Sequence, residues 1–469
     1  MENFVLSHLE PGNVFRFFEE LSRIPRESGH TDAVSAWVED FARTRGLRCR
    51  RDELGNVVIW KDASPGYEGH PAVILQGHTD MVCVQSPGTD HDFEKDPLTL
   101  VLDGDWLRAE NTTLGGDDGA AVAMMLALLD DDAIPHPPIE AVFTADEEIG
   151  LLGAAGLDCS DLQGRTLINL DSEDEGVLTV GCAGGARCDL ALSLPLRPAS
   201  GKLCTLELTG LPGGHSGAEI HKNIPNANRV LAQCLQALPD ARLVSLCGGE
   251  QDNAIPDRAR AVFVLPEDQT ENAPEKFHEL KSGAVCSFTW ASHAPADALS
   301  PEDTRKAVGL ILSAPNGVQA MEPDLPGQVR TSLNLGILRL EEGRLRLTWS
   351  VRSSAGAEKE KLIEALKALA DSCGGTFSRR GDYPAWEYRP ASRLRDVMVR
   401  VYRERTGKEP VVETIHAGLE CGLLAQKLPG LDAVSIGPDM RDIHSPRERL
   451  SIPSVRRTWE YLLAVLAQL

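Results

Sequence analysis

Apolar residues recur along the chain at two spacings, and their alternation predicts an α/β protein. Recurrence at helical spacing, or an apolar run of helical length, predicts helices over residues 32–45, 120–129, 225–238, 358–370, 394–402 and 454–466. Short apolar runs bounded by glycine, proline or turn residues predict strands over residues 47–51, 57–60, 73–75, 138–144, 166–170, 188–194, 203–208, 259–265, 332–338, 345–351 and 433–436. Strands that alternate with helices are typical of a sheet covered by helices.

The Gly-rich residues 181–185 mark a change in this order, and we place a domain boundary there. Residues 187–386 contain mainly predicted strands with two helices, which predicts an α+β domain with an antiparallel sheet. Helix and strand patterns of the first kind resume at about residue 387. The apolar runs before residue 181 are those of strands buried on both faces, and such strands form mostly parallel sheets flanked by helices.

Composition narrows the class of protein and its compartment. The chain has 469 residues, of which 42% are hydrophobic and 25% charged, ordinary values for a globular protein of two domains. A net charge of −23 argues against nucleic acid or an anionic membrane as the main partner. Eleven cysteines without a Cys-x-x-Cys pair indicate free thiols in a reducing cytoplasm. No signal peptide and no apolar run of membrane-spanning length is apparent, so we expect a cytoplasmic location.

Three predicted strands end in side chains that can bind a metal ion. His78 and Asp80 follow the first, Glu147 and Glu148 the second, and Asp171 the third. Ligands of open α/β sheets bind beyond the carboxyl ends of the strands. An imidazole can bind metal through one nitrogen while a carboxylate holds the other, and these are the roles that we predict for His78 and Asp80. The pair alone is a weak signal, since a strand-end histidine can simply cap a loop, but the convergence of several segments is a strong one.

Two adjacent acids stand before the buried helix predicted at 120–129. Asp117 and Asp118 follow two glycines, which let the backbone bend sharply. Capping of the helix is the ordinary role of an acid there, but it needs only one carboxylate. We therefore predict that Asp117 bridges two cations. The run Asp146-Glu147-Glu148 supports the same view, because the repulsion among three adjacent acids is costly unless a metal ion or a proton relieves it.

Together these segments supply a nitrogen and oxygen ligand set without sulfur, consisting of His78, Asp117, Glu148, Asp171 and His444. Such a set suits two divalent ions, zinc first and manganese or cobalt as alternatives. Each ion would take one histidine, one terminal carboxylate and a share of Asp117. Ions paired in this way lie about 3.5–4 Å apart and lower the pKa of the water between them. Glu147 is then placed as general base and acid, and we expect hydrolysis of an amide.

The ordered motifs of the chain closely resemble those of the M20 metallopeptidases: His78-Thr-Asp80, Gly115-Gly-Asp117-Asp-Gly119, Asp146-Glu147-Glu148-x-Gly150, Asn169-Leu-Asp171, Gly213-Gly-His215-Ser-Gly217 and His444-Ser-Pro-x-Glu448. The runs Asn111-Thr-Thr-Leu-Gly and Ala417-Gly-Leu-Glu-Cys-Gly422 are similar to those of the aminoacyl-histidine dipeptidase branch, the bacterial Xaa-His or β-alanyl-histidine dipeptidases. The resemblance spans nearly the whole chain. The chain departs from the branch at Asp118, where asparagine is frequent.

This resemblance implies a fold of the zinc-exopeptidase type and a specific activity. Residues 1–186 and 387–469 would form a catalytic domain that holds two metal ions, interrupted by a lid and dimerisation domain over residues 187–386. The protein would be a cytoplasmic homodimer. Its substrates would be unblocked dipeptides, including Xaa-His types such as β-alanyl-histidine.

Four residues of the lid and of the segment after it are candidates for contact with the substrate. His215, on a glycine-framed loop, would donate a hydrogen bond to the oxyanion of the tetrahedral intermediate, in cis or across a dimer; the alternative is a plain turn. Arg352 offers a two-donor fork for the carboxylate of a dipeptide. Asn253 could donate an amide N–H, and Gly418 permits close backbone approach. Their ordinary roles would be a surface ion pair, a turn and a helix-start glycine.

Other functions share some of these features. An N-acyl amino acid deacylase or a carboxypeptidase on the same scaffold would have identical metal residues and would differ only in its pocket. A binding protein built on an inactive hydrolase fold is a second alternative, against which the intact Glu147 argues. A purely structural acidic protein would leave the acids at the strand ends unexplained.

Overall fold

The computed structural model describes residues 5–270, 282–291 and 296–469. Residues 1–4, where a signal peptide would begin, lie outside the described residues. By internal packing the chain divides into two compact units: unit 1 comprises Met1–Gly181, Tyr388–Thr414 and Leu419–Leu469, and unit 2 comprises Cys182–Glu387 and Ile415–Gly418. Among the described helices, none is long and apolar enough to cross a membrane. The functional division into catalytic and lid domains stays a prediction.

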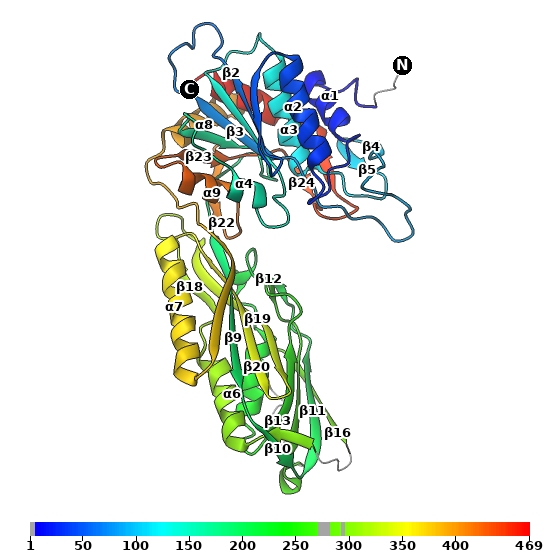
Figure 1. Ribbon diagram of the computed structural model, residues 1–469, viewed down its shortest axis with the longest axis vertical. Coiled ribbons are helices and arrows are strands. Elements are labelled where there is room, and N and C mark those ends of the chain that lie inside the picture. The colour runs from blue at the N-terminus through cyan, green and yellow to red at the C-terminus, as the bar shows by residue number, and fades with distance from the viewer. Residues whose placement is uncertain (1–4, 271–281, 292–295) are drawn as a thin grey trace. The chain divides into compact units, whose positions relative to one another are not determined.

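Unit 1 is built on an eight-stranded sheet with the order β1-β2-β6-β3-β7-β23-β8-β22 (Figure 1). Its strands are β1 (Arg48–Arg51), β2 (Val57–Lys61), β3 (Val73–His78), β6 (Ile139–Thr144), β7 (Thr166–Asn169), β8 (Val177–Cys182), β22 (Val411–Ile415) and β23 (Asp432–Ser435). The four central strands, β6, β3, β7 and β23, are parallel neighbours. β1, β2 and β8 pair in antiparallel fashion. The α/β class is confirmed, but the sheet is mixed, with its parallel part at the centre.

Helices cover this sheet, and in Figure 1 three of them, α1 to α3, lie together on one side of it. The helices of unit 1 are α1 (Gly12–Leu21), α2 (Asp32–Thr44), α3 (Gly116–Asp130), α4 (Leu152–Gly156), α8 (Arg393–Thr406), α9 (Glu420–Lys427) and α10 (Ile452–Leu466). A small antiparallel sheet joins β4 (Leu100–Asp103), β5 (Trp106–Ala109), β25 (Arg449–Ser451) and β24 (Met440–Arg441).

The buried helix α3 packs directly on β3 because a glycine makes room for it. A Cβ atom on Gly77 would lie 2.7 Å from the Cβ of Ala121 and 2.6 Å from Oδ2 of Asp118. Both distances are shorter than real Cβ contacts, so a larger residue would push the helix away from the strand. The start of α3 is thereby held next to the carboxyl end of β3, where His78 stands.

Unit 2 contains a nine-stranded sheet. Eight of its strands follow the order β16-β11-β15-β13-β19-β20-β9-β21, and the ninth, β18, pairs with β19. Its strands are β9 (Gly184–Ser193), β11 (Lys202–Thr209), β13 (Arg242–Gly248), β15 (Ala259–Leu265), β16 (Val285–Ala291), β18 (Gly317–Met321), β19 (Val329–Glu341), β20 (Arg344–Ser353) and β21 (Thr376–Tyr383). All of its pairings are antiparallel, as predicted.

The described part of unit 2 also contains two short pairs of strands and three α-helices. β10 (Leu196–Ala199) pairs with β17 (Ala296–Leu299), and β12 (Gly214–His215) pairs with β14 (Ala254–Ile255). The helices are α5 (Ala227–Gln236), α6 (Pro301–Ser313) and α7 (Gly356–Cys373). Figure 1 shows α7 running along the long strands of the sheet. Helix α6 was not predicted, nor was α1 of unit 1; α6 begins at a proline, which the first turn of a helix accepts.

Candidate metal centre

The carboxyl ends of β3, β6 and β7 meet at one edge of the unit 1 sheet because these strands are parallel neighbours. His78 ends β3, and Asp171 follows β7 by two residues. Nε2 of His78 lies 4.0 Å from Oδ1 of Asp171 and 3.0 Å from Oδ1 of Asp117, which stands at the start of α3. Three of the predicted ligands are therefore brought together.

A second imidazole contacts the same carboxylate from the loop before β25. Nε2 of His444 lies 3.2 Å from Oδ2 of Asp117 and 2.8 Å from Oε1 of Glu148, which follows β6. Ligand atoms of these three residues all lie within 4.8 Å of one another, a spacing that one ion can span. Asp117 thus contacts a different imidazole with each of its two oxygens. This is the arrangement expected of a carboxylate shared by two ions.

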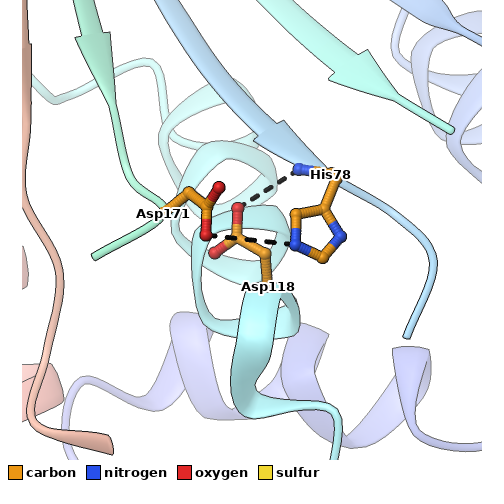
Figure 2. Close-up of side chains that lie close together, drawn as sticks. All are labelled: His78, Asp118 and Asp171. Carbon is orange, nitrogen blue, oxygen red and sulfur yellow. Dashed lines mark hydrogen bonds and ion pairs between the residues drawn. The ribbon is translucent and has the colours of Figure 1, made fainter. Parts of the chain in front are cut away.

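Asp118 forms a close group with His78 and Asp171 that the sequence did not predict (Figure 2). The backbone N–H of His78 donates to Oδ2 of Asp118 at 3.2 Å, and the carboxyl is fully buried. Burial raises the pKa of Asp118 well above its usual range, which favours the protonated form. The other oxygen, Oδ1, is buried without a hydrogen-bond partner among the described residues.

Asp80 contacts both His78 and the acidic turn that follows β6. Its Oδ1 and its carbonyl oxygen lie 3.4 and 3.1 Å from Nδ1 of His78, opposite the nitrogen that faces Asp117. Its carboxylate also accepts the backbone N–H groups of Glu147 at 3.0 Å and Glu148 at 3.3 Å. Burial by itself raises the pKa of Asp80, but the hydrogen bonds with His78 and Ser28 outweigh it and lower the pKa to about 2. Asp80 is therefore ionised and orients the histidine.

Glu147 differs from its neighbours in its acidity. Burial, followed by the charges of Glu420 and Glu148, raises the pKa of Glu147 to about 8 in the ion-free protein, against the opposing effect of His78. Ligand atoms of Glu147, His78 and Glu148 lie within 4.8 Å of one another. A carboxyl with such a pKa next to a metal site can take up a proton and return it near neutral pH.

A polar network lies on the strands just before the predicted ligands, and sequence reasoning missed it. The carboxylate oxygen Oε2 of Glu420, at the start of α9, accepts from Nε2 of Gln76 and Oγ1 of Thr144, each at 2.6 Å. Nδ2 of Asn169 donates to Oε1 of Gln76 at 2.7 Å. All four residues are buried. These hydrogen bonds connect β3, β6 and β7 within four residues of His78, Glu148 and Asp171. The sequence signal for this network was the presence of polar residues inside mostly apolar strands.

The four candidates for substrate contact all lie in unit 2. His215 is exposed on β12, where its backbone N–H donates to Oε2 of Glu219 and its Nδ1 accepts from Ala218 N at 3.1 Å. The carbonyl of Asn253 accepts the N–H of Ser216 at 2.8 Å, so Asn253 lies beside the His215 loop. Burial, and then the charge of Arg352, lowers the pKa of His215. A neutral imidazole results, with Nε2 available as a donor.

Arg352 is a buried cation without an anionic partner among the described residues. It is 9% exposed, and its Nη1 donates to the hydroxyl of Tyr383 at 3.3 Å and the carbonyl of His416 at 3.5 Å. The ring of Tyr383 reaches this position between two glycines: a Cβ on Gly185 or Gly418 would lie 2.5 or 2.8 Å from it. The ordinary alternative for Arg352, a surface ion pair, does not agree with this burial, and the predicted role in substrate binding stays a prediction. A buried guanidinium that lacks a carboxylate is suited to bind one.

Comparisons with known proteins agree with this geometry. The cytosol non-specific dipeptidase of Escherichia coli is 35% identical over 99% of both chains. The crystal structure of aminoacylhistidine dipeptidase from Vibrio alginolyticus superposes with a TM-score of 0.92 at 35% identity, covering 99% of this chain and 98% of that one. Aminopeptidase PepT from Bacillus cereus shares the fold, with a TM-score of 0.57 at 16% identity over 98% and 99% of the chains. Residues 74–468 match the family described as Peptidase family M20/M25/M40, and the chain therefore belongs to this family of peptide-bond hydrolases.

Proposed function

We propose that the protein is a metal-dependent dipeptidase that hydrolyses the peptide bond of unblocked dipeptides, including Xaa-His types such as β-alanyl-histidine. The observation that carries the proposal is Asp117, which contacts His78 with one oxygen and His444 with the other, while Glu147 lies close to His78. Two relatives at 35% identity are dipeptidases, which supports the proposal.

The proposed cofactor is a pair of divalent ions, zinc first and manganese or cobalt as alternatives. The donor set fits such ions because it offers imidazole and carboxylate groups without thiolates. The electrostatics of the site also fit: hydrogen bonds with Asp117 and Glu148 raise the pKa of His444 to about 10, and burial raises that of Asp171 well above its usual range. Cations would relieve this crowding of negative charge. The holding residues would be His78, Asp117, Glu148, Asp171 and His444, and ions there would lower the pKa of the attacking water.

The chain supplies the proton transfers and the orientation. Glu147 would take the proton of the water as it attacks the peptide carbonyl and would then donate it to the leaving amine. Asp80 would keep His78 in the orientation in which Nε2 faces Asp117. His215 would donate from Nε2 to the oxyanion of the tetrahedral intermediate.

We expect the His215→Ala variant to lose turnover by about 10²–10³-fold, because one oxyanion donor is removed. Metal content, measured by elemental analysis, should stay unchanged, since all proposed ligands lie in unit 1. Mixing the inactive His215→Ala and Glu147→Gln proteins tests whether the oxyanion donor comes from the same subunit or from a partner subunit. Regained activity would mean that it comes from a partner subunit. An unchanged metal content with full turnover would remove His215 from the mechanism.

The proposed carboxylate site explains why the substrate would be an unblocked dipeptide. The unpaired guanidinium of Arg352 would bind the C-terminal carboxylate, with Asn253 and Gly418 as further contacts. The acids around Asp171 would attract the free amine at the other end; Glu173, two residues on, is exposed and carries a further carboxyl there. Recognition of both ends next to the scissile bond would restrict the substrate to two residues.

A dipeptide and its C-terminal amide, assayed side by side, test this proposal. We expect the amide to be cleaved at least tenfold more slowly, because charge-assisted hydrogen bonds to a carboxylate contribute about 1.5–3 kcal/mol each. Arg352→Ala should raise KM for the dipeptide and remove the difference between the two substrates. Arg344→Ala, an exposed arginine on the same strand β20, is the matched control and should change neither. Equal rates on dipeptide and amide in the wild type would instead favour a deacylase.

We also infer a cytoplasmic homodimer. The support for the compartment is that the Escherichia coli relative is a cytosol dipeptidase and that none of the eleven cysteines forms a disulfide bond within the described chain. The support for the dimer is the family resemblance. Light scattering on the purified protein should give twice the chain mass of 50.8 kDa.

A further inference from the structure

The carboxylate of Glu448 binds the backbone of the loop that leads into α3. Oε2 accepts the N–H groups of Leu114 at 2.8 Å and Gly115 at 3.0 Å, and Oε1 accepts those of Gly116 at 2.7 Å and Asp117 at 3.4 Å. Glu448 is 3% exposed, and more than 330 residues of sequence separate it from this loop. Four consecutive amides around one carboxylate form an anion-binding nest, filled here by a side chain of the protein itself.

The same loop is held from its other side by Arg26. Nη2 of Arg26 donates to the carbonyl of Gly115 at 2.6 Å, and Nη1 donates to the carbonyls of Thr79 and Asp80 at 3.1 and 3.2 Å. Gly115 has a φ of 64°, and a Cβ there would lie 2.2 Å from Nη2 of Arg26. The loop is therefore fixed between a buried anion and a buried cation, and only glycine fits at its centre.

Glu448 and His444 belong to one turn and contact the two ends of the same residue. The N–H of Glu448 donates to the carbonyl of Ser445 at 3.0 Å, which closes the turn. His444 contacts the side chain of Asp117 at 3.2 Å, while Glu448 accepts the backbone N–H of Asp117. One segment thus sets both the position of the Asp117 backbone and the direction of its carboxylate.

We propose that Glu448 is a positioning residue that holds Asp117 in place to be shared by two metal ions. The inference rests on the proposed function, in which Asp117 is the shared ligand. Glutamine is nearly the same size as glutamate, but its NH2 group would face backbone N–H groups that need an acceptor. Part of the nest would lose its partner, the loop would shift, and Asp117 would no longer be held to serve both ions.

Zinc affinity of the full-length Glu448→Gln protein, measured by competition with a chromophoric chelator, tests the inference. We expect zinc to bind about 10–100-fold more weakly, the effect that groups supporting a metal ligand typically have. Turnover should fall at limiting zinc and recover at excess zinc, with KM for a dipeptide unchanged. A residue needed only for folding would instead lower the yield of active protein without this recovery.

Glu140→Gln is the matched control. Glu140 is also 3% exposed and accepts backbone N–H groups, those of Gln163 at 2.9 and 3.1 Å and of Gly164 at 2.9 Å, in a loop without predicted ligands. Its variant should lose thermal stability but keep the zinc affinity of the wild type. Should Glu448→Gln fail to fold, Glu448→Asp, whose shorter carboxylate reaches fewer amides, should show the same weakening to a smaller degree.

The outcomes separate this inference from the proposed function. Equal zinc affinity in the Glu448 variant and the wild type would overturn the positioning role and leave the metal site standing. A similar loss of affinity in both the Glu448 and Glu140 variants would also overturn it, since the effect would then be general instability. A wild-type protein that binds no divalent ion would overturn both.

Discussion

The Glu147→Gln variant is expected to retain its metal ions and its fold but to lose about 10²–10⁴-fold in kcat, the usual effect of removing a general base. Glutamine keeps the shape of the side chain and cannot accept a proton. The backbone N–H of residue 147 still donates to Asp80, so the turn that carries Glu148 is unchanged. Steady-state kinetics together with metal analysis on one sample measure both parts of this prediction.

The pH dependence of the rate provides a second test of the role of Glu147 as a base. Glu147 acts as a base only when ionised, and burial raises its pKa to about 8 in the ion-free protein. Bound cations lower that value, so kcat/KM of the loaded enzyme should fall as the pH decreases through a pKa below 8. Asp146→Asn, a change in the adjacent acid whose Oδ1 accepts from Gly29, should keep this profile. Wild-type turnover in the Gln variant would show that another group activates the water.

Removal of the metal ions should abolish activity altogether. Treatment with a chelator is expected to give an inactive protein, because the proposed ions lower the pKa of the attacking water. Added zinc, manganese or cobalt should restore the activity. Alanine at any one of the ligands should lower metal content or activity sharply: His78, Asp117, Glu148, Asp171 or His444. A metal-free sample with full activity would end the hypothesis.

Metal binding should also release protons. In the ion-free protein the pKa of His444 is about 10, and hydrogen bonds with Asp117 and Asp80 raise that of His78 despite its burial. Both imidazoles therefore carry protons at neutral pH, which an incoming ion must displace. Zinc affinity should rise with pH over the neutral range. Calorimetry in buffers of different ionisation enthalpy counts the protons directly.

The parts of the site that sequence patterns predicted are those that strands deliver. β3, β6 and β7 are buried on both faces and so are mostly apolar, and parallel pairing places their ends together. The acids and the histidine that follow them could be assigned to one edge of a sheet before any coordinates existed. Edge strand β21, Thr-Phe-Ser-Arg-Arg-Gly-Asp-Tyr, has too few apolar residues to give such a signal and was missed.

Contacts between residues distant in sequence could not be predicted in this way. Glu448 was visible only as the last letter of a motif, because the amides that it binds belong to a loop whose shape is not encoded in any apolar pattern. Asp118 could be interpreted only as a capping residue, because its burial next to His78 and Asp171 depends on distant parts of the chain. Arg352 could be named from the sequence, but its burial and its contact with Tyr383, whose ring packs against two glycines, could not.

The strand order of unit 1 has a consequence for how the protein is made. β23, from near the end of the chain, lies between β7 and β8, both of which are synthesised some 250 residues earlier. The sheet of the emerging chain therefore has an opening beside β7 that nothing can close until residues 432–435 have left the ribosome. Unpaired strand edges of this kind attract other chains, and pairings between such distant segments form slowly. The centre that would hydrolyse peptides is thus completed late in synthesis, since His444 follows β23 in the chain.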